Sequence, residues 1–506
     1  MITRLKQENN MKKLVYIATI ASSMLLTTSC VDLTQEPQSF ITEEEFIARM
    51  DVTALQQATS ALYLDLWGGN YGFNCRLQRI NVCADDITYR AAKANNPLAN
   101  YYNLTPSVTG NDADFSGTWP LFYTVIHNAN KYINKTVLPT DPSKAKQFEA
   151  VLGESYFLRG LSYFYLTRMY GDVPLILKAE DATTTMPRSA VADIYDQAII
   201  PSLQRAVELL PATSRSGFSS TPSKWAAKAC LADAYMTMAG WPLKRGQEYY
   251  SLAAEAAKDI IDNSGLHLTE EYAELWKEAN KEQANEVMFA LHHNAKLKTA
   301  SNYGKSYYPS DFAPNAGWSD YYANESFFLN YPDDARKEWN YMTEWNTKNG
   351  HVTYQESADK LPAISKYYDY DNGAAGKSAQ SNGITCIYRY ADVLLMYAEA
   401  STRATNSVNA QALDAIQKVQ KRAGYADNQL TTTTDPVAFT TAVFNERGWE
   451  LFAEMKRWFD LVRLEKVNEV RPETWNGSLF QRNNHYYFPV PYQQIDLAQW
   501  TNNPGY

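Results

Sequence analysis

The sequence predicts a mostly α-helical protein, with tetratricopeptide-type helix pairs as its scaffold and two long irregular insertions. Three segments fit the first helix of such a pair, where small residues let two helices approach closely and large residues fill the groove between them. Two intervening stretches, 68–119 and 290–385, are rich in Gly, Asn, Pro, Ser and Tyr and have little helical period. Loops of that length in a compact domain commonly carry function, so we expect them to form the ligand face.

The helix-pair pattern occurs at three places in the chain. Residues 152–156 read LGESY and fit Leu-Gly-x-x-Tyr, and residues 231–235 read LADAY, with Ala in place of Gly. The third copy, 390–400, is looser, and Gly424 ends the helix that follows it. The predicted scaffold segments are about 40–67, 120–285 and 386–470.

The N-terminus has the order of an export signal. Lys12 and Lys13 precede an apolar run over 14–26, and small polar residues then lead to Cys30. This run is too short for a bilayer-spanning helix, which needs about 20 residues. Cys30 stands where bacterial lipoproteins carry an acylated cysteine, although Thr27 replaces the usual Leu. We predict a signal peptide over 1–29 and a lipid-anchored mature chain over 30–506, against the alternative of a plain secretory signal.

Composition excludes several classes of function. The 506 residues are 45% hydrophobic, which supports a buried core, and the formal charge of −9 offers no basic field for nucleic acid. Neither the cysteines nor the six histidines have the spacing of a metal site, so we expect no metal and no cofactor. We expect mostly free, buried thiols at the four cysteines after Cys30, which are Cys75, Cys83, Cys230 and Cys386.

The sharpest enzymatic alternative is a run of glutamates. Glu446, Glu450 and Glu454 are spaced four apart on a predicted helix, and neighbouring carboxylates can serve a glycosidase as acid and base. Arginines on the same helix can neutralise them, and an apolar stripe suggests that the helix is buried. The arginines are Arg447, Arg457 and Arg463, and the stripe is Leu451, Met455, Trp458 and Val462. We therefore predict a structural helix and no catalytic residue, and we interpret the pair His292 and His293 as structural too.

An ordered set of motifs covers most of the chain. Residues 446–463 read ERGWELFAEMKRWFDLVR. The others are Leu158-Arg159, YGDVPL at 170–175, Arg188-Ser189, LLP at 209–211, RYADVLLMYAEA at 389–400 and NPGY at 503–506. Together with Cys30, this set resembles the SusD/RagB family of nutrient-uptake lipoproteins. Two departures are Asn502, where the family usually has Gln, and Pro201, which interrupts a helix.

The resemblance implies a SusD-like helical fold and a non-catalytic lipoprotein of the outer membrane that faces the cell exterior. Such a protein captures oligo- or polysaccharide and delivers it to a partner SusC-like, TonB-dependent transporter. Some family members take peptides, which leaves a RagB-like peptide-binding protein open. A surface glycoside hydrolase and a tetratricopeptide scaffold that binds only protein are further alternatives.

The candidate glycan contacts lie in the two insertions. A flat aromatic side chain can cover the apolar C–H face of a pyranose ring. Trp318 follows Gly317, so we expect its indole to be exposed. The other aromatic candidates are Tyr307, Tyr308, Tyr321, Tyr322 and Tyr101. The resemblance places sugar-binding polar residues at Asp85, Asp86 and Arg90, with a loop cap or an ion pair as the alternative.

Overall fold

The computed structural model describes residues 41–68, 73, 77–91, 96–105, 110–283, 285–368 and 381–506, without the side chains of 113–115. The chain divides into a unit over 1–48 and a unit over 49–506. In the first unit the described helix is α2 (Glu43–Ala48). The predicted signal peptide, Cys30 and Cys75 lie outside the described residues.

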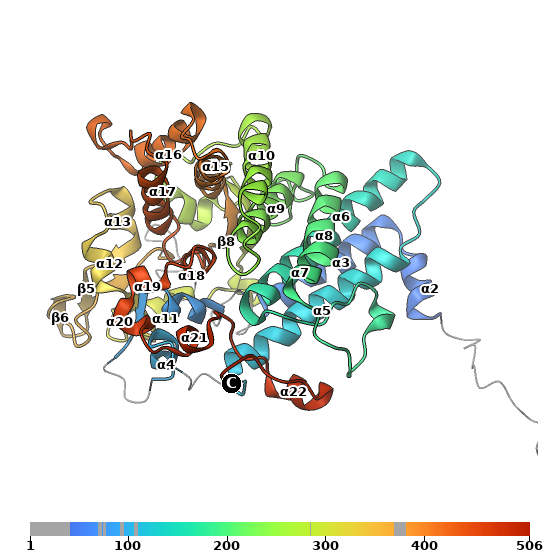
Figure 1. Ribbon diagram of the computed structural model, residues 1–506, viewed down its shortest axis with the longest axis horizontal. Coiled ribbons are helices and arrows are strands. Elements are labelled where there is room, and N and C mark those ends of the chain that lie inside the picture. Colours follow the sequence, from blue (N-terminus) through green and yellow to red (C-terminus); the bar gives the residue numbers. More distant parts are fainter. Residues whose placement is uncertain are drawn as a thin grey trace, which may run out of the picture. The chain divides into compact units, whose positions relative to one another are not determined.

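The unit over 49–506 is mostly helical (Figure 1). Its long helices are α3 (Val52–Trp67), α5 (Ala113–Lys135), α6 (Pro142–Tyr170), α8 (Ile200–Leu209), α9 (Lys224–Ala239), α10 (Gln247–Asn263), α15 (Tyr390–Thr405), α16 (Ala410–Ala423) and α17 (Pro436–Glu450). Its short helices are α4 (Leu98–Tyr102), α7 (Val191–Ile194), α11 (Tyr303–Tyr307), α12 (Glu325–Leu329), α13 (Ala335–Asn340), α18 (Arg457–Arg463), α19 (Val467–Val470), α20 (Pro472–Trp475), α21 (Leu479–Asn483) and α22 (Tyr492–Ala498).

The strands form small two-stranded antiparallel ribbons. These pair β1 (Ile87–Tyr89) with β3 (Tyr321–Ala323), β2 (Val287–His292) with β8 (Ile384–Arg389), β4 (Tyr341–Met342) with β7 (Ala363–Ile364), and β5 (Glu344–Thr347) with β6 (Gly350–Thr353). Most of these strands lie within the two predicted insertions, which thus contain short ordered elements. Among the helices that the structure describes, none is long and apolar enough to cross a membrane.

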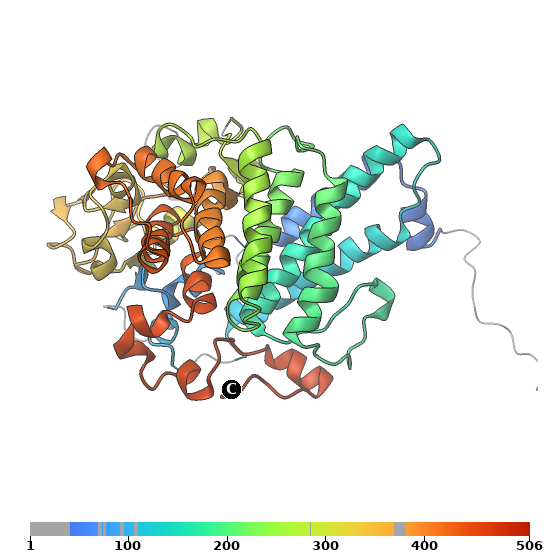
Figure 2. The ribbon, with the colours of Figure 1, turned by 45° about the horizontal axis from the view of Figure 1, so that its top comes forward.

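The long helices pack in sequence order, as a tetratricopeptide-type scaffold requires. Helix α6 contacts α5 and α8, α9 contacts α8 and α10, and α15 contacts α16 and α17. Helix α10 also packs against α15, although the whole of the second insertion separates them in the sequence. Figures 1 and 2 show α10 between α9 and α15. The scaffold is therefore continuous, and the insertion is carried at its side.

Two glycines explain why α6 and α8 can approach so closely. A Cβ atom on Gly153 would lie 2.9 Å from Cγ of Leu210, and one on Gly160 would lie 2.9 Å from Cγ of Leu203. Neither distance is compatible with a normal side-chain contact, so larger residues would push the two helices apart. The small residue of the LGESY pattern thus has the role that the sequence predicted.

The motif at 446–463 is not one helix, which corrects the sequence prediction. Helix α17 ends at Glu450 and α18 begins at Arg457. Between them Ala453 and Met455 adopt left-handed conformations, with φ of 60° and 59°. Carbonyl groups freed by the break accept hydrogen bonds from the second insertion, at 2.7 Å from Nζ of Lys366 to Phe452 O and at 2.8 Å from the Tyr367 hydroxyl to Ala453 O. These bonds satisfy backbone groups that a continuous helix would have paired internally.

Three motifs of the ordered set meet at the end of α6. The Arg188 guanidinium donates to the Asp172 carbonyl at 2.7 Å and to Oδ1 of Asn503 at 2.5 Å. Asn503 in turn donates to the Tyr170 carbonyl at 3.0 Å. The segments YGDVPL, Arg188-Ser189 and NPGY therefore form one structural junction that fixes the C-terminus to the scaffold.

Candidate functional site

The first and second insertions meet in the ribbon of β1 and β3. Ile87 pairs with Ala323 and Tyr89 pairs with Tyr321, and the Asn324 amide donates to the Asp86 carbonyl at 3.0 Å. The ribbon brings the predicted polar residues at 85–90 beside the predicted aromatic residues at 318–322. Residues remote in sequence are thus brought together in one region of the structure.

Trp318 is the predicted aromatic residue whose ring reaches solvent. Its side chain is 47% exposed, and Nζ of Lys305 lies 5.3 Å from the ring centroid. A Cβ atom at Gly317 would lie 2.1 Å from the Tyr308 carbonyl oxygen, so this turn requires glycine. The glycine lets the loop fold tightly against its own backbone, and the following indole projects outward. The predicted exposure of Trp318 is confirmed.

The five predicted tyrosines are buried instead. They are Tyr101, Tyr307, Tyr308, Tyr321 and Tyr322. The ring of Tyr307 stacks on Tyr367 with centroids 6.0 Å apart and contacts Tyr321 at 5.5 Å. Side-chain packing covers the ring faces on which the prediction relied, and the tyrosines serve as the core of the insertions. Of the aromatic residues predicted to stack on a sugar ring, Trp318 is the one that remains a candidate.

The predicted polar residues are held by the protein itself. The Arg457 guanidinium donates to both carboxylate oxygens of Asp85, at 2.7 and 2.8 Å. Nε of Arg90 donates to Asp359 at 3.0 Å, and the same carboxylate accepts a bond of 2.7 Å from the Tyr322 hydroxyl. These contacts match the ion-pair alternative that the sequence left open.

Asp86 differs from its neighbour because it is buried and has no ion-pair partner among the described residues. Burial, and then the charge of Asp85, raise the pKa of the Asp86 carboxyl to about 7. The loss of solvation favours the neutral form. The two adjacent carboxyl groups thus have very different environments.

A cavity of about 490 Å³ opens beside Asp85, and we refer to it as the Asp85 cavity. Its lining residues are Asp85, Tyr102, Asn324, Ser326, Phe327, Asn330, Phe444, Asn445, Trp449, Arg457, Val470, Arg471, Glu473 and Thr474. Tyr102, Phe327 and Trp449 provide partly exposed aromatic surface, and three asparagines provide amide groups. This volume and this mixture suit a small polar ligand with apolar faces.

Sequence reasoning missed most of this cavity. Asn445 and Trp449 lie one turn apart on α17, so both can face the cavity from one side of the helix. The four-residue spacing of this pair is the signal that the sequence offers, but the glutamates of the same helix have the same spacing and were considered in its place. Tyr102 and Phe327 come from separate insertions, and no local pattern relates them.

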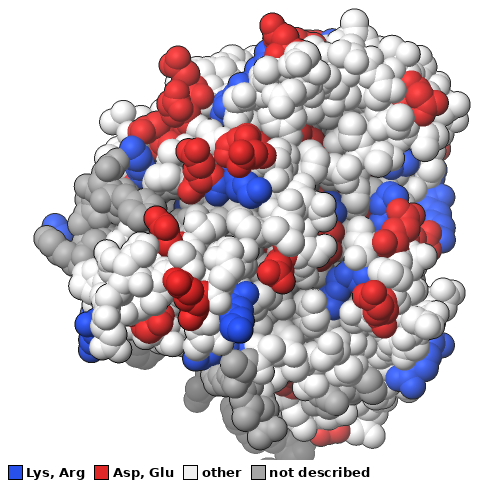
Figure 3. All heavy atoms as spheres, turned by 90° about the vertical axis from the view of Figure 1, so that its left-hand side faces the viewer, with Lys and Arg blue, Asp and Glu red and all other residues white. Residues whose placement is uncertain are grey.

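Opposite charges are balanced around the Asp85 cavity. Arg457 pairs with Asp85, and Arg471 lies 4.1 Å above the Tyr102 ring while donating to the Cys83 carbonyl at 2.9 Å. Glu473 is the second acidic residue of the lining. On the face in Figure 3, acidic and basic side chains are interspersed among uncharged ones. This arrangement favours a neutral ligand over an anionic one.

The three glutamates of the motif are buried in ion pairs and cannot meet a substrate. Arg336 contacts Glu446 at 2.5 Å and Glu450 at 2.9 Å. Arg389 and Lys366 contact Glu454 at 2.8 and 2.7 Å. Although burial opposes ionisation, the guanidinium groups of Arg422, Arg389 and Arg336 hold the pKa of the Glu450 carboxyl well below its usual range. The prediction of a structural role is supported by this burial.

The predicted partners of these glutamates were wrong. Arg447 pairs with Asp392 and Asp460, Arg457 pairs with Asp85, and Arg463 pairs with Glu399. The actual partners come from distant segments because the helix ends at Glu450 and its buried face meets the second insertion. The predicted apolar stripe is confirmed, since Leu451, Met455, Trp458 and Val462 are all buried.

The histidine pair and the described cysteines that could take part in catalysis or metal binding are largely buried within the protein. His292 contacts the Ser219 hydroxyl at 2.9 Å, and burial lowers the pKa of His292 to about 4 and that of His293 to about 3. Cys83, Cys230 and Cys386 are buried free thiols, as predicted. Within the described part of the chain, no group of three or more His, Cys, Asp or Glu is placed to hold a metal ion.

Solved structures with the same fold include a laminarin-binding protein and a protein solved with a xylogluco-oligosaccharide. A SusD homologue from Bacteroides thetaiotaomicron superposes with a TM-score of 0.81 at 21% identity, covering 92% of this chain and 99% of that one. A laminarin-binding SusD-like protein has a TM-score of 0.71 at 22% identity, covering 90% and 99%. A third structure, solved with a xylogluco-oligosaccharide, has a TM-score of 0.66 at 23% identity and covers 85% of each chain.

Sequence relatives and family models agree with the fold. A SusD-like protein of Formosa agariphila is 27% identical over 98% of this chain and 100% of its own length. A SusD-like protein of Bacteroides ovatus is 28% identical over 89% of this chain and 82% of its own length. The SusD family model matches residues 270–506, and a model described as starch-binding and associating with the outer membrane matches residues 35–236. With both halves matched and the ordered motifs in place, the chain belongs to the SusD/RagB family of outer-membrane-associated proteins.

Proposed function

We propose that this protein captures a neutral oligo- or polysaccharide at the cell surface and delivers it, uncleaved, to a SusC-like, TonB-dependent transporter. The observation that carries the proposal is the pairing of an exposed indole, Trp318, with the aromatic and amide-lined Asp85 cavity at the other end of the β1–β3 ribbon. An indole can cover the apolar face of a sugar ring, while amide groups exchange hydrogen bonds with its hydroxyls.

The spacing of the two features favours a chain of several sugar units. Residues 318 and 324 are six positions apart, so their Cα atoms lie within about 20 Å of each other even along fully extended backbone. This separation is within the length of one oligosaccharide of several sugar units. Many weak contacts along such a ligand would suit a protein that must later release it to a transporter.

Retention at the membrane is proposed to depend on Cys30. Acyl chains on this residue would anchor the protein without a transmembrane helix, because each buried methylene contributes about 0.8 kcal/mol. We also propose that the anchored protein faces the cell exterior, since a captured polysaccharide must come from outside the cell.

A ligand panel tests the proposed function. The mature protein would be titrated with laminarin, xylogluco-oligosaccharides, starch oligosaccharides and peptides, and each bound glycan would be assayed for new reducing ends. We expect binding of at least one neutral glycan and no release of reducing ends. Binding of peptides alone would favour the RagB-like alternative, and reproducible cleavage would favour a hydrolase.

A further inference from the structure

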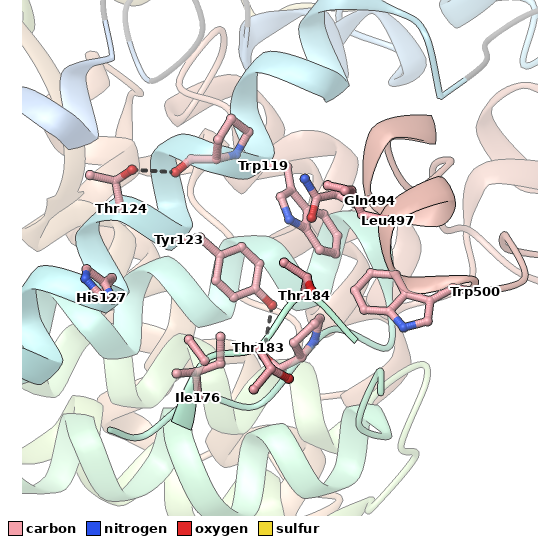
Figure 4. A pocket seen from close by; sticks show the side chains of 13 residues that line it. Trp119, Tyr123, Thr124, His127, Ile176, Thr183, Thr184, Gln494, Leu497 and Trp500 are labelled. Atoms are coloured by element: carbon pink, nitrogen blue, oxygen red, sulfur yellow. Dashed lines mark hydrogen bonds between the residues drawn. The ribbon is translucent and has the colours of Figure 1, made fainter. Parts of the chain in front are cut away.

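A second cavity lies between α5, the segment 174–184 and α22, and we refer to it as the α5–α22 pocket (Figure 4). Its volume is about 460 Å³, which is within the usual range for small-ligand sites. It shares no lining residue with the Asp85 cavity. In Figures 1 and 2, α22 lies apart from α12 and α20, which help to form that cavity.

Three aromatic rings line the α5–α22 pocket. Trp119 lies 5.2 Å from Tyr123 and 6.4 Å from Trp500, measured between ring centroids. The Tyr123 hydroxyl donates to the Pro174 carbonyl at 2.9 Å, and Nε1 of Trp500 donates to the Met186 carbonyl at 3.0 Å. These bonds fix two of the rings and use their polar atoms within the protein. The pocket thus has preformed aromatic surface whose rings need not be reordered when a ligand binds.

Polar side chains that are available for hydrogen bonding to a ligand lie at the rim of this pocket. The side chains of Thr183, Thr184 and Gln494 make no hydrogen bond to any residue that the structure describes. Figure 4 shows Thr184 between Tyr123 and Trp500, and Thr183 below Tyr123. No Asp, Glu, Lys or Arg is among the described residues that line the pocket. Apart from His127, the lining thus offers a charged ligand no counter-ion, and the exposed rim hydroxyls offer hydrogen bonds that a purely apolar ligand could not use.

We infer that the α5–α22 pocket is a second glycan-binding site, which takes one or two neutral pyranose units of a longer chain. The choice of ligand class rests on the proposed function, whereas the site itself is separate. The partly exposed rings of Tyr123 and Trp500 cover the C–H faces of the sugar, and the buried Trp119 packs against both rings. Thr183, Thr184 and Gln494 hydrogen-bond the sugar hydroxyls. Two separated sites on one protein would hold a polysaccharide by avidity, because binding at the first raises the effective concentration at the second.

A blocking variant tests the second site. Thr184→Trp places an indole at the exposed rim, where the fold can accept it, and Thr434→Trp adds the same side chain to an exposed loop as the matched control. Each would be titrated with a short laminarin oligosaccharide and with xylogluco-oligosaccharide by calorimetry, and each would be checked by thermal unfolding. We expect two binding sites in the wild type and in Thr434→Trp, and one in Thr184→Trp. For a long polysaccharide, we expect Thr184→Trp to weaken binding by about tenfold or more.

The outcomes separate this inference from the proposed function. A folded Thr184→Trp protein that titrates like the wild type would overturn the second site. A single site that Trp318→Ala removes would also overturn it and would leave the proposed function intact. Absence of binding to every neutral glycan in the panel would overturn both. Glycan binding that survives Trp318→Ala and is lost in Thr184→Trp would support the α5–α22 pocket and count against Trp318.

Discussion

Arg457 binds Asp85 through two parallel hydrogen bonds, from Nε to Oδ1 at 2.7 Å and from Nη2 to Oδ2 at 2.8 Å, although 372 positions separate the residues. The guanidinium lies 4.0 Å from the Phe444 ring centroid and is largely buried. The pair joins the first insertion to α18 and forms part of the Asp85 cavity wall. The same contact therefore attaches the insertion and shapes the cavity at which we propose that the ligand binds.

We predict that Trp318→Ala weakens glycan binding by about 1–3 kcal/mol, the loss expected when an aromatic anchor at a contact is truncated. The melting temperature should change little because Trp318 is 47% exposed. Ligand titration and thermal unfolding of the same variant measure the two effects. Trp458→Ala is the matched control, since Trp458 is buried and its truncation should cost about 3–5 kcal/mol of stability. A stable Trp318→Ala protein with normal affinity would refute this role.

Asp86→Asn should stabilise the protein at neutral and alkaline pH. With a folded pKa of about 7, Asp86 keeps its proton in the native state when the unfolded carboxyl has lost it, so the native state binds more protons between about pH 4 and pH 7. The contribution of the Asp86 carboxyl to the free energy of unfolding therefore falls as the pH rises from about 4 to about 7. The gain from Asp86→Asn should grow from pH 4 to pH 7, by at most about 4 kcal/mol, and then level off.

Denaturant unfolding at several pH values measures this gain. Asp85→Asn is the control with the opposite sign, because it leaves Arg457 buried without its anionic partner and should destabilise the protein by about 3–5 kcal/mol. Equal gains from Asp86→Asn at pH 4 and pH 8 would show that Asp86 does not titrate as described.

Glu450→Gln should cost about 3–5 kcal/mol of unfolding free energy, because it leaves Arg389 and Arg422 buried with less compensating charge. The depressed pKa of Glu450 also means that its contribution is present above about pH 4 and is lost as pH falls below that value. Urea titrations at pH 7 and at acidic pH measure both effects. Glu465→Gln breaks an exposed pair with Lys244 and should change stability by less than about 1 kcal/mol. Similar losses in the two variants would argue against a special role for the buried cluster.

Cys30→Ala should release the protein from membranes without unfolding the unit over 49–506. The prediction follows from the export signal that ends at Cys30 and from the contribution of acyl chains to membrane binding. Detergent-phase partitioning and circular dichroism measure retention and folding. A variant that partitions with the detergent phase like the wild type would show that another element anchors the chain.

Local patterns predicted the scaffold well, because helix pairing depends on neighbours in the sequence. Gly153 permits the approach of Leu210, and Gly424 ends α16 in a left-handed conformation with φ of 99°. The end of α17 at Glu450 could not be predicted in this way. Its cause is tertiary, since Lys366 and Tyr367 of the second insertion bind the carbonyls that the break exposes.

The candidate site was less predictable than the scaffold. The Gly317–Trp318 turn is local, and its exposed indole was foreseen. The burial of Tyr307 and Tyr321 was not, because their packing partners lie elsewhere in the insertions. Composition shows that a loop is rich in tyrosine, but it does not show which tyrosines form the core of that loop.

The interrupted helix between Glu450 and Arg457 restricts how this segment can evolve. Because this connection is short and contains two left-handed residues, adding or removing one residue there would change where α18 begins relative to α17. Arg457 would then point away from Asp85 and Trp458 would leave the core. Substitutions at 451–456 leave this alignment intact when volume and charge are kept, whereas a change of length alters every contact of α18 at once. In this segment we therefore expect changes in the number of residues to be more damaging than most changes in their identity, so that the surface loops are the better place for insertions.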